Sequence, residues 1–203
     1  MNFFSWNNRG LGNPETVREL HSLMKMEGPA LVFLCETKIE GRRVSDLTTW
    51  LGFEGCYPVS SDGLSGGLAL FWSKDVEVTL ENFSKSHIDV MVSQNNKTWR
   101  LTGFYGEPRV ENLHHNWRFL RTLFAIPHRA WLCLGDFNET LSADEHFSIH
   151  ARPEAQMRAF RKAISDCALQ DLGWRGVPFT WDNRQQGDMN VKARLDRDLV
   201  NQH

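Results

Sequence analysis

The sequence lacks an excess of positive charge. Its 23 Lys and Arg residues are outnumbered by 25 Asp and Glu residues, so the formal net charge is −2 and the pI is about 6.4. A protein that binds nucleic acid mainly by neutralising phosphates is normally basic. The composition therefore argues against broad electrostatic binding, and any contact with nucleic acid must come from local patches.

Long hydrophobic runs and paired cysteines are also missing. No apolar stretch approaches the roughly 20 residues that cross a membrane, and the N-terminal residues MNFFSWNN lack the features of a signal peptide. The cysteines form no CxxC pair, which argues against a zinc ribbon. Cys35 and Cys133 lie in apolar runs and are predicted to be buried free thiols, as in a reducing compartment. We therefore expect an intracellular protein with no membrane partner.

What the sequence does contain is enough apolar material for one domain. The chain has 203 residues, of which 41% are hydrophobic, and it carries eight Trp and thirteen Phe against two Tyr. One sizeable core is the normal outcome at this length. Residues 1–203 are therefore predicted to form a single domain.

Apolar runs predict most of the strands. Continuous runs predict buried strands at 30–35 and 130–134, and alternating residues predict half-buried strands at 76–80 and 88–92. Further strands are predicted at 3–6, 66–72, 99–104 and 179–181, and a last strand at 194–200, where a helix is the alternative.

Three helices are predicted between these strands. Asn13 and Pro14 form a helix start, because Asn caps well and Pro suits the first helical position. Apolar residues spaced three and four apart predict two more helices, at 113–124 and 157–167. Strands outnumber helices and the helices fall between groups of strands. The predicted fold is therefore α/β (α+β), with two mixed β-sheets packed face to face and helices outside.

Polar side chains follow four of the apolar strands. The strand at 3–6 runs into Asn7, the strand at 30–35 into Glu36, and the strand at 99–104 into Tyr105; the strand at 130–134 is followed by Asp136 and Asn138. Strand ends that meet at one edge of a sheet form a rigid pocket floor. Carboxylates there suit Mg²⁺, which prefers oxygen ligands. Each residue alone also has an ordinary explanation, such as a turn residue or an Asx turn.

Eight segments around these residues form an ordered set of motifs. They are WNNRGLGN (6–13), FLCETK (33–38), GLSGGLALFW (63–72), TGFYGEP (102–108), WLCLGDFNE (131–139), MRAF (157–160), DLGWRGVPFTWDN (171–183) and RLDR (194–197). In this order they resemble the endonuclease domain of plant non-LTR (LINE-type) retrotransposons, a branch of the endonuclease/exonuclease/phosphatase superfamily. The resemblance covers essentially the whole chain and implies a four-layered sandwich.

The resemblance also implies residue roles in Mg²⁺-dependent hydrolysis of DNA, with Mn²⁺ as an alternative ion. Glu36 would be the principal metal ligand, with Asn7 beside it. Asp136 would align or deprotonate the attacking water. Asn138 would hold the scissile phosphate or orient Asp136, and Tyr105 would hydrogen-bond a phosphate oxygen. Such donors would stabilise charge that develops on the phosphoryl group.

One family motif is absent. In the family, Asp196 of RLDR would orient a histidine in a later Ser-Asp-His segment, and this chain has no such segment. We therefore expect the domain to be incomplete at its C-terminus, with the family's final strands missing. Loss of an acid/base group commonly costs about 10²–10⁴ in rate, so we expect little nuclease activity from this chain.

Three functions remain open from the sequence. The first is a DNA-nicking endonuclease, nuclear if it belongs to an active element, with DNA as partner and no obligate protein partner. The second is a non-catalytic folded remnant with at most weak nucleic-acid binding. The third is a relative that hydrolyses a small phosphoester, against which the plant-type motifs argue. Candidate DNA-facing cations are Lys38, Arg42, Arg43, Arg184, Lys192, Arg194 and Arg197, although a solvated surface is the better explanation of them.

Overall fold

A computed structural model describes residues 2–126 and 130–201. The chain groups into two compact units: unit 1 is Met1–Tyr105 with Cys133–Gly135, and unit 2 is Gly106–Leu132 with Asp136–His203. The described residues form a four-stranded sheet, a six-stranded sheet and a small three-stranded sheet, together with helices. The predicted combination of two large mixed sheets and helices is confirmed.

The four-stranded sheet lies in unit 1 and brings the ends of the strands before Asn7 and Glu36 next to each other. Its order is β1-β2-β4-β3, with β1 at Phe3–Asn7, β2 at Leu31–Cys35, β4 at Leu68–Trp72 and β3 at Gly55–Val59. β1 and β2 are parallel, whereas β4 is antiparallel to both β2 and β3. The β1–β2 register pairs Asn7 with Cys35, so Asn7 and Glu36 emerge at neighbouring strand ends.

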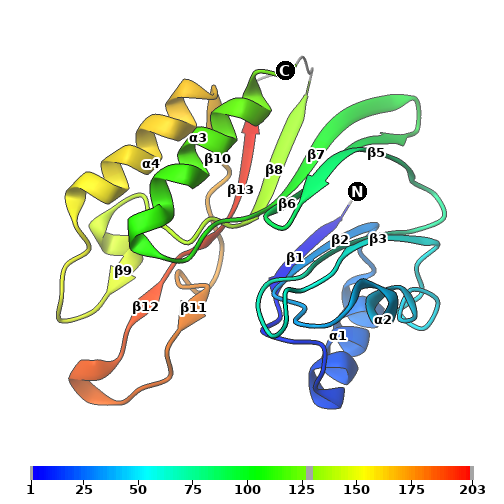
Figure 1. Ribbon diagram of the computed structural model, residues 1–203, viewed down its shortest axis with the longest axis horizontal. Helices are drawn as coiled ribbons and strands as arrows, with labels where there is room; N and C mark the ends of the chain where they lie inside the picture. The colour runs from blue at the N-terminus through cyan, green and yellow to red at the C-terminus, as the bar shows by residue number, and fades with distance from the viewer. Residues whose placement is uncertain (1, 127–129, 202–203) are drawn as a thin grey trace. The chain divides into compact units, whose positions relative to one another are not determined.

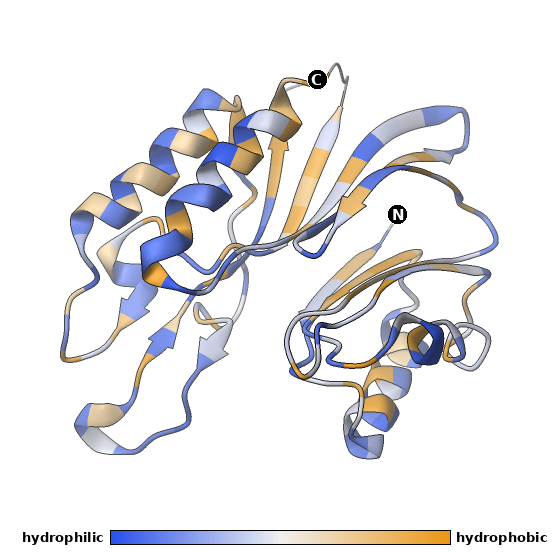
Figure 2. Cartoon of the chain, in the orientation of Figure 1, coloured by the Kyte–Doolittle hydropathy of each residue, from blue (hydrophilic) through white to orange (hydrophobic). Residues whose placement is uncertain are grey.

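Two helices cover one face of this sheet (Figure 1). The longer helix, α1 (Pro14–Glu27), begins as predicted: the Asn13 side chain accepts a hydrogen bond from the Glu15 N–H, and Gly28 ends the helix in the left-handed conformation. The short α2 spans Gly41–Ser45. The core between helices and sheet includes Leu20, Met24, Val32, Leu34, Val44, Ala69 and Phe71. Figure 2 shows the resulting apolar strands and two-faced helices.

Three further strands of unit 1 form an antiparallel meander: β5 (Glu77–Ser84), β6 (His87–Gln94) and β7 (Lys97–Tyr105). Asn95 and Asn96 make the β6–β7 turn at φ 50° and 61°, as the twist of a tight hairpin requires. Gly103 of β7 lies against Phe33 of β2, because a Cβ at residue 103 would come within 2.2 Å of that ring. The two sheets of unit 1 therefore pack face to face at a position that only glycine fits.

The prediction that β6 is half-buried is wrong. β5 alternates as expected, but most of β6 is buried on both faces. The second face is polar: the Arg100 guanidinium binds the Asp89 carboxylate at 2.8 Å, and Thr102 Oγ1 donates to the same carboxylate at 2.6 Å. Buried polar groups persist when they are hydrogen-bonded. A satisfied ion pair therefore lets the second face of β6 be buried although only its first face is apolar.

Unit 2 is built around two helices that lie side by side, α3 (Leu113–Phe124) and α4 (Glu154–Asp166) (Figure 1). Trp117 of α3 stacks on Phe160 of α4, with ring centroids 4.4 Å apart. The other elements are β8 (Trp131–Asp136), which also contributes Cys133–Gly135 to unit 1, β9 (His146–Phe147), β10 (Leu169–Asp171), β11 (Trp181–Asp182), β12 (Lys192–Ala193), β13 (Asp196–Asn201) and the 3₁₀ turns Val110–Asn112, Ala143–Glu145 and Gly187–Met189.

The prediction that Arg194 and Arg197 face DNA is wrong. Both side chains are buried and both pair with the same two carboxylates: Arg194 lies 2.9 Å from Glu145 and 2.8 Å from Asp171, and Arg197 lies 2.6 Å from Asp171 and also binds Glu145. Four charges neutralise one another inside unit 2, so neither arginine is a surface cation. Arg42, Arg43 and Arg184 are exposed, as expected.

Several short elements were not predicted. β3 contains Gly55 and Pro58, which weaken a strand signal, but β3 is an edge strand, where Pro is tolerated. α2, β9, β10 and β12 are too short for a periodic pattern. The burial of Cys35 and Cys133 as free thiols is confirmed. Among the described residues, no helix is long and apolar enough to span a membrane.

Candidate active site

Glu36 is the centre of a polar cluster in unit 1. It follows β2 directly, and its side chain is 22% exposed. The Tyr105 hydroxyl donates a 2.7 Å hydrogen bond to Glu36 Oε1, and Lys38 Nζ lies 3.0 Å from Oε2. The Asn7 side chain also hydrogen-bonds the Glu36 carboxylate. Three predicted site residues, from β1, β2 and β7, therefore meet in one place.

Two glycines hold the turn that presents Glu36. Glu36 and Lys38 adopt left-handed backbone, with φ 57° and 54°, which is uncommon for such residues. The backbone N–H groups of Thr37 and Lys38 donate to the carbonyls of Gly67 and Gly66, at 3.1 and 3.0 Å. A Cβ on Gly67 would lie 2.3 Å from Thr37 Oγ1, and its own φ is 86°. Gly66 and Gly67 of the GLSGG segment therefore hold the backbone of the turn next to Glu36.

The Glu36 carboxylate is held in its ionised form. Partial burial by itself would raise the pKa of Glu36, but hydrogen bonds from Tyr105 and Lys38, the charge of Lys38 and a hydrogen bond from Asn7 together hold the pKa below its usual range. A carboxylate that is ionised at neutral pH and partly open to solvent is the type of oxygen ligand that Mg²⁺ binds.

Asp136 and Asn138 form a second polar cluster, in unit 2. Asp136 is the last residue of β8 and is buried. Its Oδ1 accepts a 2.8 Å hydrogen bond from the Asn138 N–H, so the Asx turn is present. Asn138 has φ 56°, a conformation that Asn tolerates better than most residues. Its side-chain amide donates to the Gly106 carbonyl at 2.8 Å, and the Gly106 N–H donates to the Asp136 carbonyl at 2.8 Å.

Asn116 of α3 fixes the chain next to Gly106. Its Oδ1 accepts from the Glu107 N–H at 2.8 Å, and its Nδ2 donates to the Glu107 carbonyl at 3.3 Å. A Cβ on Gly106 would lie 2.8 Å from the Phe137 carbonyl oxygen. The glycine is therefore required for two backbone segments to lie this close, and Asn138 is anchored to a rigid segment.

Glu139 and Arg152 hold the other side of the same turn. Glu139 is fully buried, and Arg152 donates to it through Nε at 2.8 Å and through Nη2 at 3.1 Å. The Glu139 Oε1 also accepts from the Thr140 N–H at 2.9 Å. Neither residue was assigned a role from the sequence, because a contact across the loop between residues 139 and 152 leaves no sequence signal.

Asp196 begins β13 in unit 2. The Thr180 hydroxyl accepts hydrogen bonds from the N–H groups of Leu195 and Asp196, at 3.0 and 3.1 Å. Arg194 and Arg197, on either side of it, are buried in the charge network described above. The role of Asp196 in orienting a histidine stays a prediction.

The structure therefore gathers Asn7, Glu36 and Tyr105 in one unit and Asp136 and Asn138 in the other. It adds four residues to these sets: Lys38, Asn116, Glu139 and Arg152. The described residues contain no group of three or more His, Cys, Asp or Glu side chains that could hold a metal by themselves. Any ion at Glu36 would accordingly take few protein ligands, as Mg²⁺ normally does.

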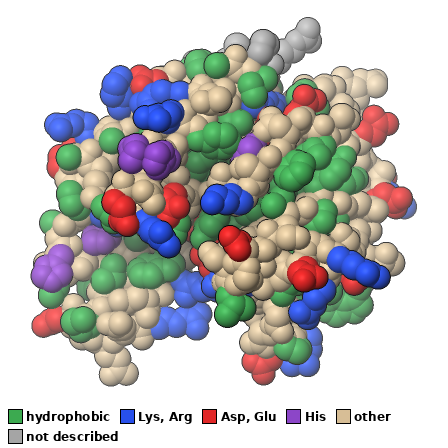
Figure 3. Space-filling model, in the orientation of Figure 1, with side chains coloured by type: hydrophobic (Ala, Val, Ile, Leu, Met, Phe, Trp, Pro, Cys, Tyr) green, Lys and Arg blue, Asp and Glu red, His purple; other side chains and the backbone are tan. Residues whose placement is uncertain are grey.

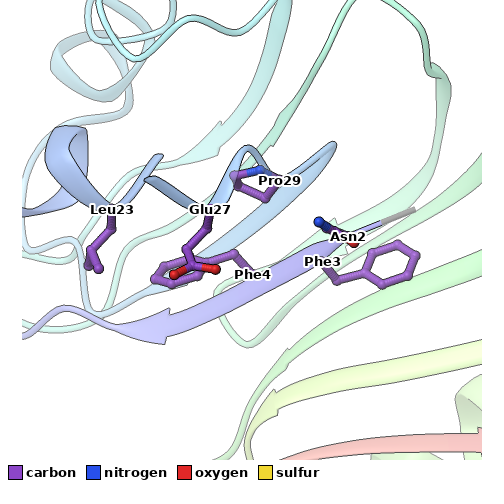
Figure 4. Close-up of a pocket in the computed structure, with 6 residues that line it drawn as sticks. All are labelled: Asn2, Phe3, Phe4, Leu23, Glu27 and Pro29. Atoms are coloured by element: carbon purple, nitrogen blue, oxygen red, sulfur yellow. The ribbon is translucent and has the colours of Figure 1, made fainter. Parts of the chain in front are cut away.

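A separate surface pocket lies at the other end of β1. It has a volume of about 420 Å³ and is lined by Asn2, Phe3, Phe4, Leu23, Glu27 and Pro29 (Figure 4). Asn7 ends the strand whose opposite end lines this pocket, so the pocket is not part of the Glu36 cluster. On the face drawn in Figure 3, acidic and basic side chains are interspersed, in keeping with the near-neutral composition.

Comparison with known proteins identifies the family. The model of the endonuclease/exonuclease/phosphatase family matches residues 1–197, so the chain belongs to that family. A comparison with curated proteins gives no match.

Three similar solved structures show the same fold. The endonuclease domain of TRAS1, a telomere-specific non-LTR retrotransposon, is 15% identical with a TM-score of 0.67, over 98% of this chain and 84% of that chain. The 3′ phosphatase NExo from Neisseria, bound to product DNA hairpin, is 17% identical with a TM-score of 0.71, over 97% and 85%. The AP endonuclease LMAP from Leishmania major is 16% identical with a TM-score of 0.70, over 98% and 78%.

Proposed function

We propose that this chain is a Mg²⁺-dependent phosphodiester hydrolase that nicks DNA, of the retrotransposon endonuclease type. Family membership supports a nuclease or phosphatase. The observation that carries the finer proposal is the Glu36 cluster, in which Tyr105 and Asn7 hold an ionised, partly exposed carboxylate. DNA as the substrate is supported by the retrotransposon motifs and by the DNA-bound state of one similar structure.

The donor set around Glu36 fits Mg²⁺. The carboxylate supplies a hard anionic oxygen, and Asn7 supplies an amide group beside it. A bound Mg²⁺ would act as a Lewis acid that stabilises charge on the phosphoryl oxygens. Tyr105 keeps Glu36 in one orientation through its 2.7 Å hydrogen bond, as partners of metal-binding carboxylates commonly do.

Asp136 and Asn138 are proposed to act in the same reaction. Asp136 would accept the proton of the attacking water, and Asn138 would position Asp136 or donate to a phosphate oxygen. The Asx turn holds Asp136 Oδ1 through the Asn138 N–H at 2.8 Å. General-base catalysis of this kind contributes about 10²–10⁴ in rate.

The test is nicking of supercoiled plasmid by excess protein under single-turnover conditions. Nicking should require Mg²⁺ and disappear in Glu36→Gln, whereas Glu77→Gln, at an exposed glutamate of β5, should behave as wild type. Nicking that survives EDTA or Glu36→Gln contradicts the proposal.

The alternative is a folded remnant without catalysis. Binding of Mg²⁺ at Glu36, followed by NMR, combined with no nicking after long incubation would support this alternative. A substrate panel of plasmid DNA, a phosphoinositide and sphingomyelin tests the third candidate. Hydrolysis of a phosphoinositide or of sphingomyelin, but not of DNA, would indicate a small-phosphoester hydrolase instead of an endonuclease or a non-catalytic remnant.

A further inference from the structure

Arg152 contacts the candidate catalytic loop directly, although it lies in the segment before α4. Its Nη2 donates to the Asn138 carbonyl at 3.2 Å in addition to binding both oxygens of Glu139. Its side chain is 20% exposed, and the Glu139 side chain is 0% exposed. The Arg152 guanidinium thus binds two successive residues of the GDFNE motif, Asn138 and Glu139.

The contact with the Asn138 carbonyl is the important one. Asn138 has a left-handed backbone, and its N–H is the donor to Asp136 Oδ1. Rotation of the peptide between residues 138 and 139 would change ψ of Asn138 and so disturb the left-handed turn, although the N–H that binds Asp136 belongs to the preceding peptide. Arg152 opposes that rotation because it holds the carbonyl at 3.2 Å and the next side chain at 2.8 Å.

The opposite side of Asn138 is fixed independently. Its side chain donates to Gly106, whose neighbour Glu107 is held by Asn116. The turn is therefore held by α3 on one side and by Arg152 on the other. A planar guanidinium with bidentate binding fixes geometry more strongly than an ammonium would.

Burial of this ion pair is not explained by stability alone. Replacing a buried ion pair by apolar side chains is often neutral or stabilising, because desolvation offsets the attraction. In the Arg152–Glu139 pair the guanidinium also binds the carbonyl of Asn138, which has a left-handed backbone. The pair therefore helps to fix the conformation of this loop. Strained residues persist only where their surroundings over-determine them.

We propose that Arg152, through Glu139 and the Asn138 carbonyl, is a positioning residue that orients Asp136 and Asn138 for phosphodiester hydrolysis. This inference rests on the proposed function of those two residues. Arg152 itself need not touch the substrate. A misplacement of about 1 Å in a reacting group can cost about 100-fold in rate, so a loop clamp of this kind is enough to control turnover.

Amide hydrogen exchange followed by NMR tests the clamp without requiring turnover. Arg152→Met should lower the protection of the Asn138 amide about tenfold, because the hydrogen bond to Asp136 opens more often. Protection of the Phe160 amide, inside α4, should not change. Arg152→Lys should fall between wild type and Arg152→Met. Arg158→Met, at an exposed arginine of α4, is the matched control and should match wild type.

Kinetics provide the second readout. Arg152→Met should lower the single-turnover rate about 10- to 100-fold with the half-saturating DNA concentration within about twofold. Glu139→Gln should have a smaller effect in the same direction.

The inference is overturned if the Asn138 amide exchanges at the same rate in Arg152→Met as in the wild-type protein. Equal loss of protection at Asn138 and Phe160 in both Arg152 variants also overturns it, because Arg152 would then support the fold generally. Selective loss at Asn138 in a protein that never nicks DNA leaves the clamp standing and contradicts only the proposed function.

Discussion

Tyr105 donates a 2.7 Å hydrogen bond to Glu36, a residue 69 positions earlier in the chain. The two residues end β7 and follow β2, strands of the two sheets that pack together in unit 1. The geometry ties the orientation of the candidate metal ligand to the packing of those sheets, at the glycine contact between Gly103 and Phe33.

Removal of the Tyr105 hydroxyl should weaken metal binding. In Tyr105→Phe the Glu36 carboxylate loses a donor, so its pKa should rise toward the ordinary value and its orientation should loosen. Loss of such a partner commonly costs about 10- to 100-fold in metal affinity. Isothermal titration with Mn²⁺ measures this, and Tyr57→Phe is the control, since its hydroxyl makes only a 3.5 Å contact with the Val78 carbonyl. Equal affinities for Tyr105→Phe and wild type would argue against Glu36 as the ligand.

Disruption of the buried ion pair of β6 and β7 should be costly for the fold. Arg100→Met leaves Asp89 buried without its guanidinium, and breaking a buried pair on one side typically costs about 3–5 kcal/mol. Urea unfolding of Arg100→Met against wild type measures the loss. Lys162→Met, which removes an exposed pair with Asp166 on α4, should change stability little. A loss no larger than that of the control contradicts the structural role of this pair.

The sequence predicted the strands with continuous apolar runs and the helix that begins at Asn13 and Pro14, because those patterns are local. It also predicted that Glu36 and Asp136 follow strand ends. It did not predict the burial of Arg194 and Arg197, since their partners Glu145 and Asp171 are distant in sequence. The left-handed conformation of Glu36 and the Arg152 clamp were also invisible, because both depend on tertiary hydrogen bonds.

His87 should make stability fall in mild acid. Burial lowers the pKa of His87 to about 4, a shift that Asp89 partly opposes and the charge of Arg100 adds to. The folded protein therefore keeps His87 neutral, whereas the unfolded chain protonates it near pH 6.5. The contribution of neutral His87 to the free energy of unfolding is fully present above pH 6.5. It is lost as the pH falls toward 4, at up to about 1.4 kcal/mol per pH unit.

Urea unfolding at pH 7.0, 5.5 and 4.5 checks the sign. The loss of stability should be smaller in His87→Gln than in wild type, and His115→Gln, at an exposed residue of α3, should follow wild type. Parallel pH profiles for His87→Gln and wild type would show that other groups cause the acid sensitivity.

The central proposal is that Glu36, held by Tyr105 and Asn7, is the ligand of the divalent ion. Paramagnetic broadening by Mn²⁺ in an NMR titration tests it most directly, because it requires no turnover. We predict that substoichiometric Mn²⁺ broadens the amide signals of Thr37 and Lys38, next to Glu36, and that Glu36→Gln abolishes both effects. Sharp Thr37 and Lys38 signals at Mn²⁺ concentrations that broaden other amides, or broadening of these two signals that survives Glu36→Gln, would contradict the proposal.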